Sequence, residues 1–398
     1  MTGDRGAPHG VPAPAPPSLP ALRAAEFPWT LGGDVAYLNH ASTGPLPART
    51  VKALGEFDRL RAHPWRIAHD YQFGVLARSR ELCARLVGAE AREIALMVNT
   101  TYGINFAARA LPLAPGDVVL SSDREFPANV YPWMALESAR GVTFRQLPCV
   151  DRLADEDALL QALDEPRVRV LTISWVSFET GLRIDLKRLG AACRERGIYF
   201  VVDAIQGVGA APLDVHTCHI DILACGAQKW LLSPWGTGFL YVRGDLVQRL
   251  EPNDVGWMSV KGSEDFTRLI DYDLTYFDDA RRFEVITLPF QDFAGMNASL
   301  ELFFDLGPDR LYAQVVERTS QIVAWARGRH DVRLATPADQ RRRAGIVSVI
   351  PANPAAVSAR LTKAGVVHSL REGLIRLSPH FYTSEEEVQL ALTLIGQD

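Results

Sequence analysis

Short apolar runs alternate with amphipathic segments along the chain from about Tyr37 onward. The runs at 118–120, 168–175 and 198–202 are almost wholly apolar, which is typical of strands that are buried on both faces. The segments around them space their apolar residues as helices do, over 102–110, 155–163 and 186–196. This alternation predicts an α/β fold with a mostly parallel central sheet.

The pattern changes after about residue 290. Helical spacing over 298–304 and 311–329 precedes a strand-like run at 345–350 and a charged helix at 384–395. These elements predict a second, smaller α+β domain at the C-terminus. The predicted parts are a disordered Pro/Ala-rich arm at 1–20, a segment packing on the small domain at 21–45, a large domain at 46–290 and a small domain at 291–398.

Composition and charge narrow the class of protein. Of the 398 residues, 47% are hydrophobic and 22% charged, which excludes wholesale disorder and a coiled coil. A net charge of −5 gives no basic excess, so we expect neither nucleic acid nor a membrane as a partner. No stretch reaches the ~18 apolar residues of a membrane span. Five scattered cysteines without a CxxC pair predict reduced thiols and a cytoplasmic location.

A carboxylate and a lysine follow two of the predicted strands. Asp203 ends the apolar run that begins at Tyr199, and Lys229 follows the run 221–226. In open α/β sheets, ligands bind at the carboxyl ends of the strands. A lysine near a carboxylate suits pyridoxal phosphate (PLP), because the amine forms a Schiff base with the aldehyde and the carboxylate keeps the pyridinium nitrogen protonated.

The residues 203–207 (DAIQG), Lys229 twenty-six positions after Asp203, and 233–242 (SPWGTGFLYV) together resemble the class V aminotransferase family of fold-type I PLP enzymes. That family includes cysteine desulfurases, isopenicillin N epimerase-like proteins and C–S lyases. The resemblance extends from about Tyr37 to the C-terminal SPHFYTSEEEV. It implies a fold-type I architecture, a PLP cofactor, an amino-acid substrate and a homodimer with shared active sites.

The resemblance also implies roles for individual residues. Lys229 matches the Schiff-base lysine, Asp203 the partner of the pyridinium nitrogen, and Gln206 the ligand of the ring hydroxyl. Thr100 and Thr101 match the phosphate-binding turn, where the N-terminus of a helix favours a dianion.

Further matches concern the substrate and the partner subunit. Arg376 matches the arginine that binds the substrate α-carboxylate, a task that suits a bidentate guanidinium. Thr287 matches a threonine that reaches the phosphate of the partner subunit's cofactor. His40 is expected either to contact substrate or to cap the N-terminal turn.

Several positions depart from the desulfurase pattern. Phe126 stands where many relatives stack a histidine on the pyridine ring, and a phenylalanine cannot transfer a proton. Gln228 replaces a phosphate-binding histidine, and Phe178 replaces an asparagine that reaches the ring hydroxyl. The segment 367–373 holds no cysteine, although desulfurases carry a mobile one just before the carboxylate-binding arginine. These departures favour the epimerase-like and C–S lyase branch.

The main prediction is therefore a PLP-dependent lyase or transaminase that acts at the Cα of an amino acid. The alternatives are an isopenicillin N epimerase-like epimerase and, from another class, a catalytically silent PLP-binding protein acting through a partner. We expect no metal, because His216 and His219 flank Cys218 without a second ligand pair. A nicotinamide-dependent dehydrogenase is a third class, which would lack the visible chromophore of PLP.

Overall fold

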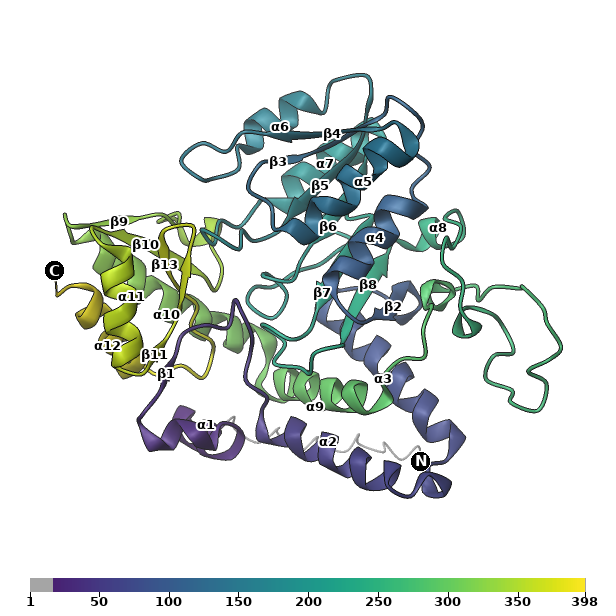
Figure 1. Ribbon diagram of the computed structural model, residues 1–398, viewed down its shortest axis with the longest axis horizontal. Coiled ribbons are helices and arrows are strands. Elements are labelled where there is room, and N and C mark those ends of the chain that lie inside the picture. Colours follow the sequence, from purple (N-terminus) through teal and green to yellow (C-terminus); the bar gives the residue numbers. More distant parts are fainter. Residues whose placement is uncertain (1–16, 398) are drawn as a thin grey trace, which may run out of the picture.

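A seven-stranded sheet forms the centre of the large domain in the computed structural model, which describes residues 17–397 (Figure 1). Six of the seven strands run in the same direction, and one strand runs antiparallel to both of its neighbours. In spatial order the strands are β2 (Ile94–Met97), β8 (Gly238–Val242), β7 (Ile222–Gly226), β6 (Tyr199–Asp203), β5 (Val168–Ser174), β3 (Val118–Ser122) and β4 (Thr143–Leu147). The prediction of a mostly parallel sheet is confirmed.

The strand β8 is antiparallel to both β7 and β2. Only residues 227–237 connect β7 to β8. A parallel crossover needs about a dozen residues or more, usually with a helix, so this short connection must turn back on itself. The turn places the loop that contains Lys229 at the carboxyl end of β7.

The strands read as apolar runs because helices cover both faces of the sheet (Figure 1). Alternate residues enter two separate cores: Phe200 and Val202 pack on one face, and Val201 packs on the other. The second core is covered by α4 (Thr100–Ala110) and α5 (Tyr131–Arg140). The first core is covered by α3 (His69–Val87), α6 (Glu156–Ala162), α7 (Leu186–Arg196) and α9 (Phe290–Leu306).

The small domain is built on an antiparallel sheet in the order β12 (Ser369–Arg371), β13 (Leu374–Leu377), β10 (Val347–Pro351) and β9 (Val332–Leu334). The helices that contribute to its core are α10 (Pro308–Arg327), α11 (Pro354–Lys363) and α12 (Glu385–Ile395). A short α8 (Gly244–Val247) belongs to the large domain.

The long helix α9 differs from the sequence-based boundary at residue 291. It begins at Phe290, earlier than the helical pattern over 298–304 indicated, and packs along α2 (Ala48–Arg61) and α3. The large domain therefore includes α9. The chain turns at Gly307, whose φ of 84° is a conformation that glycine adopts without strain.

The N-terminal segment contacts the small domain. Its strand β1 (Ala36–Tyr37) pairs in parallel with β11 (Val366–Val367), and the Arg23 guanidinium lies 2.8 Å from the Glu387 carboxylate. The helix α1 (Leu19–Glu26) begins within the arm predicted at 1–20, because Ser18 caps it and Leu22 joins a buried apolar cluster. Residues 1–16 of that arm lie outside the described residues. Within 17–397, no helix is both long enough and apolar enough to cross a membrane.

The close packing of α4 on the sheet predicts the effect of a single added methyl group. A β-carbon at Gly103 would lie 2.7 Å from the Ala224 β-carbon and 2.8 Å from the Met97 sulfur. We expect Gly103→Ala to lower the free energy of unfolding by about 1–3 kcal/mol, measured by urea denaturation, because the core is overpacked. Gly74→Ala is the control: the site is open, and the change should stabilise α3 by about 0.5–1 kcal/mol. Equal stabilisation by both changes would contradict the packing described here.

Candidate active site at the carboxyl edge of the sheet

The ends of three neighbouring strands bring the candidate site together. Ser174 at the end of β5 is in register with Asp203 at the end of β6, which is in register with Ala224 in β7. The Asp203 side chain is almost fully buried and accepts a hydrogen bond of 3.1 Å from the backbone N–H of Ile205. Lys229 follows β7 by three residues, and its side chain enters the same region.

Burial controls the charge of both groups. It lowers the pKa of the Lys229 amine to about 8, an effect that Asp203 opposes and that Arg376 and Arg371 strengthen. Burial also raises the pKa of the Asp203 carboxyl group, and the nearby Glu125 carboxylate adds to this rise while Lys229 opposes it. Among residues 17–397, no ion pair within 4 Å joins Lys229 to Asp203, and the Lys229 amine has no hydrogen-bond partner. The site thus holds a nucleophilic amine whose neutral fraction near physiological pH is far larger than that of an ordinary lysine.

Arg376 enters the site from the small domain, on β13. Its side chain is buried, and it donates hydrogen bonds of 2.7 Å to the Phe178 carbonyl and 2.9 Å to the Ser42 hydroxyl. Its Nε is buried and lacks a partner within the described chain. Burial, reinforced by Arg371, lowers the pKa of Arg376 to about 10. A buried cation with a free donor is suited to binding an anion.

Two aromatic side chains line the site. Phe126 is partly exposed, and its ring meets that of Phe178 edge-on with centroids 5.4 Å apart. The Lys229 Nζ lies 5.6 Å from the Phe126 ring centroid. Phe126 also lines a cavity of 380 Å³ together with Thr101 and Tyr131. An apolar face therefore lies beside the amine.

Glu125 is a residue of the site for which the sequence analysis predicted no role. It is half-buried, and desolvation raises the pKa of its carboxyl group. It bonds to the backbone N–H of Ser174 at 3.0 Å and to the Asn129 amide at 3.0 Å. These bonds tie the segment that carries Phe126 to the end of β5. In the sequence, only its position next to Phe126 indicated that Glu125 could belong to the site.

The first turn of α4 lies next to the end of β7. The Thr100 hydroxyl accepts a hydrogen bond of 2.9 Å from the backbone N–H of Gly226, and Asn99 caps the helix by accepting from Tyr102. The contact is close, because a β-carbon at Gly226 would lie 2.6 Å from the Gln228 side-chain oxygen and 3.3 Å from the Thr100 hydroxyl. Thr101 is exposed on the same turn. Thr100, Thr101 and Gln228 therefore gather at one helix N-terminus.

Three residues assigned from the sequence are engaged elsewhere. The Gln206 amide donates to the Ala41 carbonyl at 3.0 Å and accepts from the Trp230 indole at 2.9 Å. His40 is fully buried, with both ring nitrogens bound within the protein, so its contacts favour a structural role over substrate contact. Thr287 is exposed and accepts a hydrogen bond from the Trp257 indole at 2.9 Å.

Comparison with known proteins gives matches over almost the whole chain. The sequence profile of the Aminotransferase class-V family matches residues 36–390. An isopenicillin N epimerase of Streptomyces clavuligerus is 30% identical, with 90% of this chain and 93% of the relative covered. A probable cysteine desulfurase of Methanothermobacter thermautotrophicus is 28% identical over the same shares.

Solved structures agree in fold. The cystine C–S lyase C-DES, in complex with its product cysteine persulfide, is 26% identical, with 93% of this chain and 99% of that chain covered and a TM-score of 0.84. A mutant of C-DES with glycine covalently linked to the PLP cofactor has the same TM-score of 0.84 at 25% identity, over 94% of this chain and 99% of that chain.

The charge balance of the site predicts an unusual titration of Lys229. In protein without added cofactor, the rate at which trinitrobenzenesulfonate labels Lys229, followed by peptide mapping, should be half-maximal near pH 8. An ordinary lysine is half-deprotonated only near pH ~10.4. Asp203→Asn should move the midpoint to lower pH, because the carboxylate favours the charged amine. The peptide that carries exposed Lys52 serves as the internal reference. A midpoint that rises in Asp203→Asn would show that the two groups do not face each other.

Proposed function

The chain belongs to the class V aminotransferase family of PLP enzymes, and we propose that it acts at the Cα of an amino acid as a lyase or transaminase. One observation carries this proposal: a half-buried amine, Lys229, lies within electrostatic reach of a buried carboxylate, Asp203, and of the cation Arg376. That set contains a nucleophile for an aldehyde, an anion for a ring nitrogen and a cation for a substrate carboxylate.

The residues present fit PLP. The Lys229 amine is free of hydrogen bonds within the described chain, and desolvation keeps it reactive. Asp203 is the residue that would hold the ring nitrogen. Thr100 and Thr101 would hold the phosphate, because the N–H groups at the first turn of α4 favour a dianion. Phe126 offers an apolar face on which a ring can stack.

Three further residues complete the proposed cofactor site. Gln206 would hold the ring hydroxyl with the amide N–H that its bond to Ala41 leaves free. Gln228 would bind the phosphate beside Thr100. Phe178 would close the site next to Phe126, and its carbonyl orients Arg376.

The bound cofactor supplies an electron sink that weakens the bonds at the substrate Cα. Arg376 holds the α-carboxylate with its guanidinium group and so fixes the substrate relative to the amine. The Lys229 amine, with a pKa of about 8, accepts the proton from Cα and can return it, because both protonation states are populated near neutral pH. Asp203 supplies the negative charge that stabilises a protonated ring nitrogen.

The nature of Phe126 favours elimination or transamination over epimerisation. Epimerisation requires a proton on the other face of Cα, and Phe126 has none to give. An epimerase remains the second candidate, supported by the 30% identity to the Streptomyces clavuligerus epimerase. A PLP-binding protein without turnover is the third, and the intact set of Lys229, Asp203 and Arg376 speaks against it.

A screen of amino acids decides among these functions. PLP-saturated protein should change its visible spectrum when a substrate amino acid is added and should release keto acid, with ammonia or sulfide in the case of a lyase. Lys229→Ala should lower the turnover by at least ~10³-fold, because the group that moves the Cα proton is lost. Stereoinversion without keto acid would identify an epimerase. Bound PLP without any spectral response to amino acids would identify a silent binding protein.

The screen contains a matched control for Arg376. An analogue of the best substrate that has the amino group but lacks the α-carboxylate should react far more slowly than that substrate. The expected loss is at least ~30-fold in kcat/KM, because a buried charge pair is worth about 2 kcal/mol or more. Equal rates would remove Arg376 from substrate binding.

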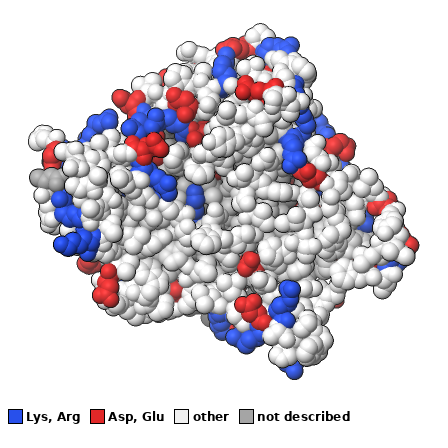
Figure 2. Space-filling model, in the orientation of Figure 1, with Lys and Arg blue, Asp and Glu red and all other residues white. Residues whose placement is uncertain are grey.

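We also propose a homodimer in which Thr287 reaches the partner subunit's phosphate site, and a cytoplasmic location that suits five unpaired cysteines. The segment between α8 and α9 exposes many large apolar side chains, among them Trp257, Phe266, Ile270 and Tyr272. A monomer rarely exposes so much apolar surface. Figure 2 shows, in addition, that the centre of one face carries few charged side chains.

Sedimentation equilibrium tests the dimer. We expect twice the mass of the chain. Ile270→Glu should shift the protein toward monomer, because it places a charge in the proposed interface. It should not unfold the subunit, because Ile270 is 79% exposed. Leu390→Glu, on the outside of α12, is the control and should leave the mass unchanged. A monomeric wild-type protein would refute the shared active site.

A further inference from the structure

His380 joins the small domain to the loop that carries Lys229. It follows β13, the strand of Arg376, by three residues and is fully buried. Its Nε2 lies 2.9 Å from the Trp230 carbonyl, and its Nδ1 accepts a hydrogen bond of 2.8 Å from the backbone N–H of Phe381. Since Nδ1 accepts, the proton is on Nε2, which donates to Trp230. The ring is therefore neutral and held in a single tautomer.

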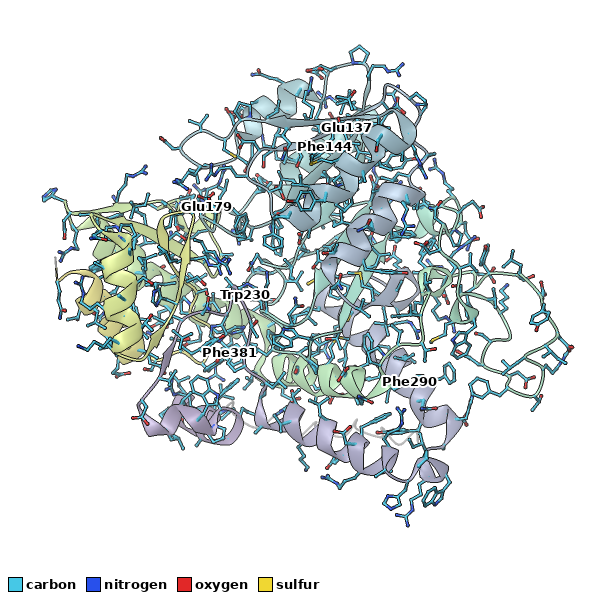
Figure 3. The ribbon with its side chains drawn as sticks, in the orientation of Figure 1. Glu137, Phe144, Glu179, Trp230, Phe290 and Phe381 are labelled. Atoms are coloured by element: carbon cyan, nitrogen blue, oxygen red, sulfur yellow. The ribbon has the colours of Figure 1, made fainter. Side chains whose placement is uncertain are left out.

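The main chain on the other side of Lys229 is held as well. The backbone N–H of Gly44, in the N-terminal segment, donates to the Gln228 carbonyl at 2.9 Å. The carbonyl groups of Gln228 and Trp230, the residues on either side of Lys229, are thus bound by two segments remote in sequence. Figure 3 shows Trp230 and Phe381 between the small domain and the large domain, where these segments meet.

A second buried histidine, His40, supports the same junction without a hydrogen bond to the lysine loop. The rings of His40 and His380 lie with their centroids 4.9 Å apart. His40 donates from Nδ1 to the Ser378 carbonyl at 2.8 Å and accepts at Nε2 from the Tyr382 hydroxyl at 2.7 Å. Burial lowers the pKa of His380 to about 4 and that of His40 well below its usual value. Both rings therefore act as neutral hydrogen-bonding groups, in opposite tautomers.

We propose that His380 is a positioning residue: its Nε2–H holds the Trp230 carbonyl and thereby fixes the Lys229 amine relative to Arg376, four residues earlier in the chain. The inference rests on the proposed roles of Lys229 and Arg376. β13 carries Arg376, and His380, three residues after the end of β13, binds the main chain next to Lys229. The Arg376 guanidinium and the Lys229 amine therefore keep their separation. A misplacement of about 1 Å in such a pair costs up to ~10²-fold in rate.

Substitutions separate positioning from simple stability. His380→Phe removes the donor but keeps a buried ring, and the released loop should let water reach Lys229. The labelling midpoint of Lys229 in cofactor-free protein should then rise by about one pH unit toward the ordinary lysine value. In the loaded enzyme kcat should fall by ~10²-fold with a smaller change in KM. His380→Gln, whose amide can still donate to Trp230, should restore most of both properties.

His40→Phe is the matched control, because it replaces an equally buried ring of the same cluster that makes no hydrogen bond to residues 228–230 and meets only the Trp230 ring, at a centroid distance of 6.2 Å. It should lower the stability but leave the Lys229 midpoint unchanged. Equal shifts of the midpoint in both Phe variants, or a shift in neither, would overturn the proposal.

A measurement on the unsubstituted protein does not depend on the folding of any variant. Nitrogen-15 NMR of histidine-labelled protein should show one buried ring protonated at Nε2 only, assigned to His380 by its loss in His380→Gln, from pH 5 to pH 8. A neutral ring with its proton on Nδ1 would lack the donor to Trp230 and refute the proposal. A charged ring would refute it as well, because its Nδ1–H could not accept the hydrogen bond from Phe381. The labelling of Lys229 and the histidine NMR both use cofactor-free protein. They can therefore fail while the amino-acid screen succeeds, and they can succeed while the screen fails.

Discussion

The site depends on an electrostatic balance between two buried groups of opposite type. Desolvation favours the neutral form of the Lys229 amine and of the Asp203 carboxyl group, whereas their mutual attraction favours the charged forms. Desolvation is the larger effect on both groups and their mutual attraction limits the shifts, so the amine keeps a reactive neutral fraction near neutral pH beside a carboxyl group that can still ionise. The fold creates this balance by ending β6 in a carboxylate and by turning back after β7 with a connection too short for a helix.

Neighbouring charged groups shift the pKa values of both residues further. Glu125, beneath the Phe126 segment, raises the pKa of Asp203, while Arg376 and Arg371 from the small domain lower that of Lys229. The positive charges make the site attractive to a carboxylate, in keeping with the role proposed for Arg376. The small domain is thus an electrostatic part of the site, and the hydrogen bond from His380 to Trp230 joins it mechanically to the lysine loop.

Sequence patterns predicted the features that are determined by residues close together in the chain. Apolar runs identified the strands, and the polar residue at the end of each run identified the edge where Asp203 and Lys229 lie. The motif matches to Thr100 and Gln228 placed two residues that do gather at Gly226. Packing over long sequence distances was not predictable in this way. The Gln206 amide meets Ala41, 165 residues away, and His40 meets Tyr382, 342 residues away. The membership of α9 in the large domain likewise depends on its packing against α2 and α3, which periodicity alone does not reveal.

The central claim is that Lys229 is the residue that holds the cofactor covalently. Reduction of PLP-saturated protein with borohydride, followed by peptide mapping, tests it most directly. We expect one reduced cofactor per chain, attached to the peptide that contains Lys229 and to that lysine alone. Saturated protein in which Lys229 emerges unmodified would contradict the account.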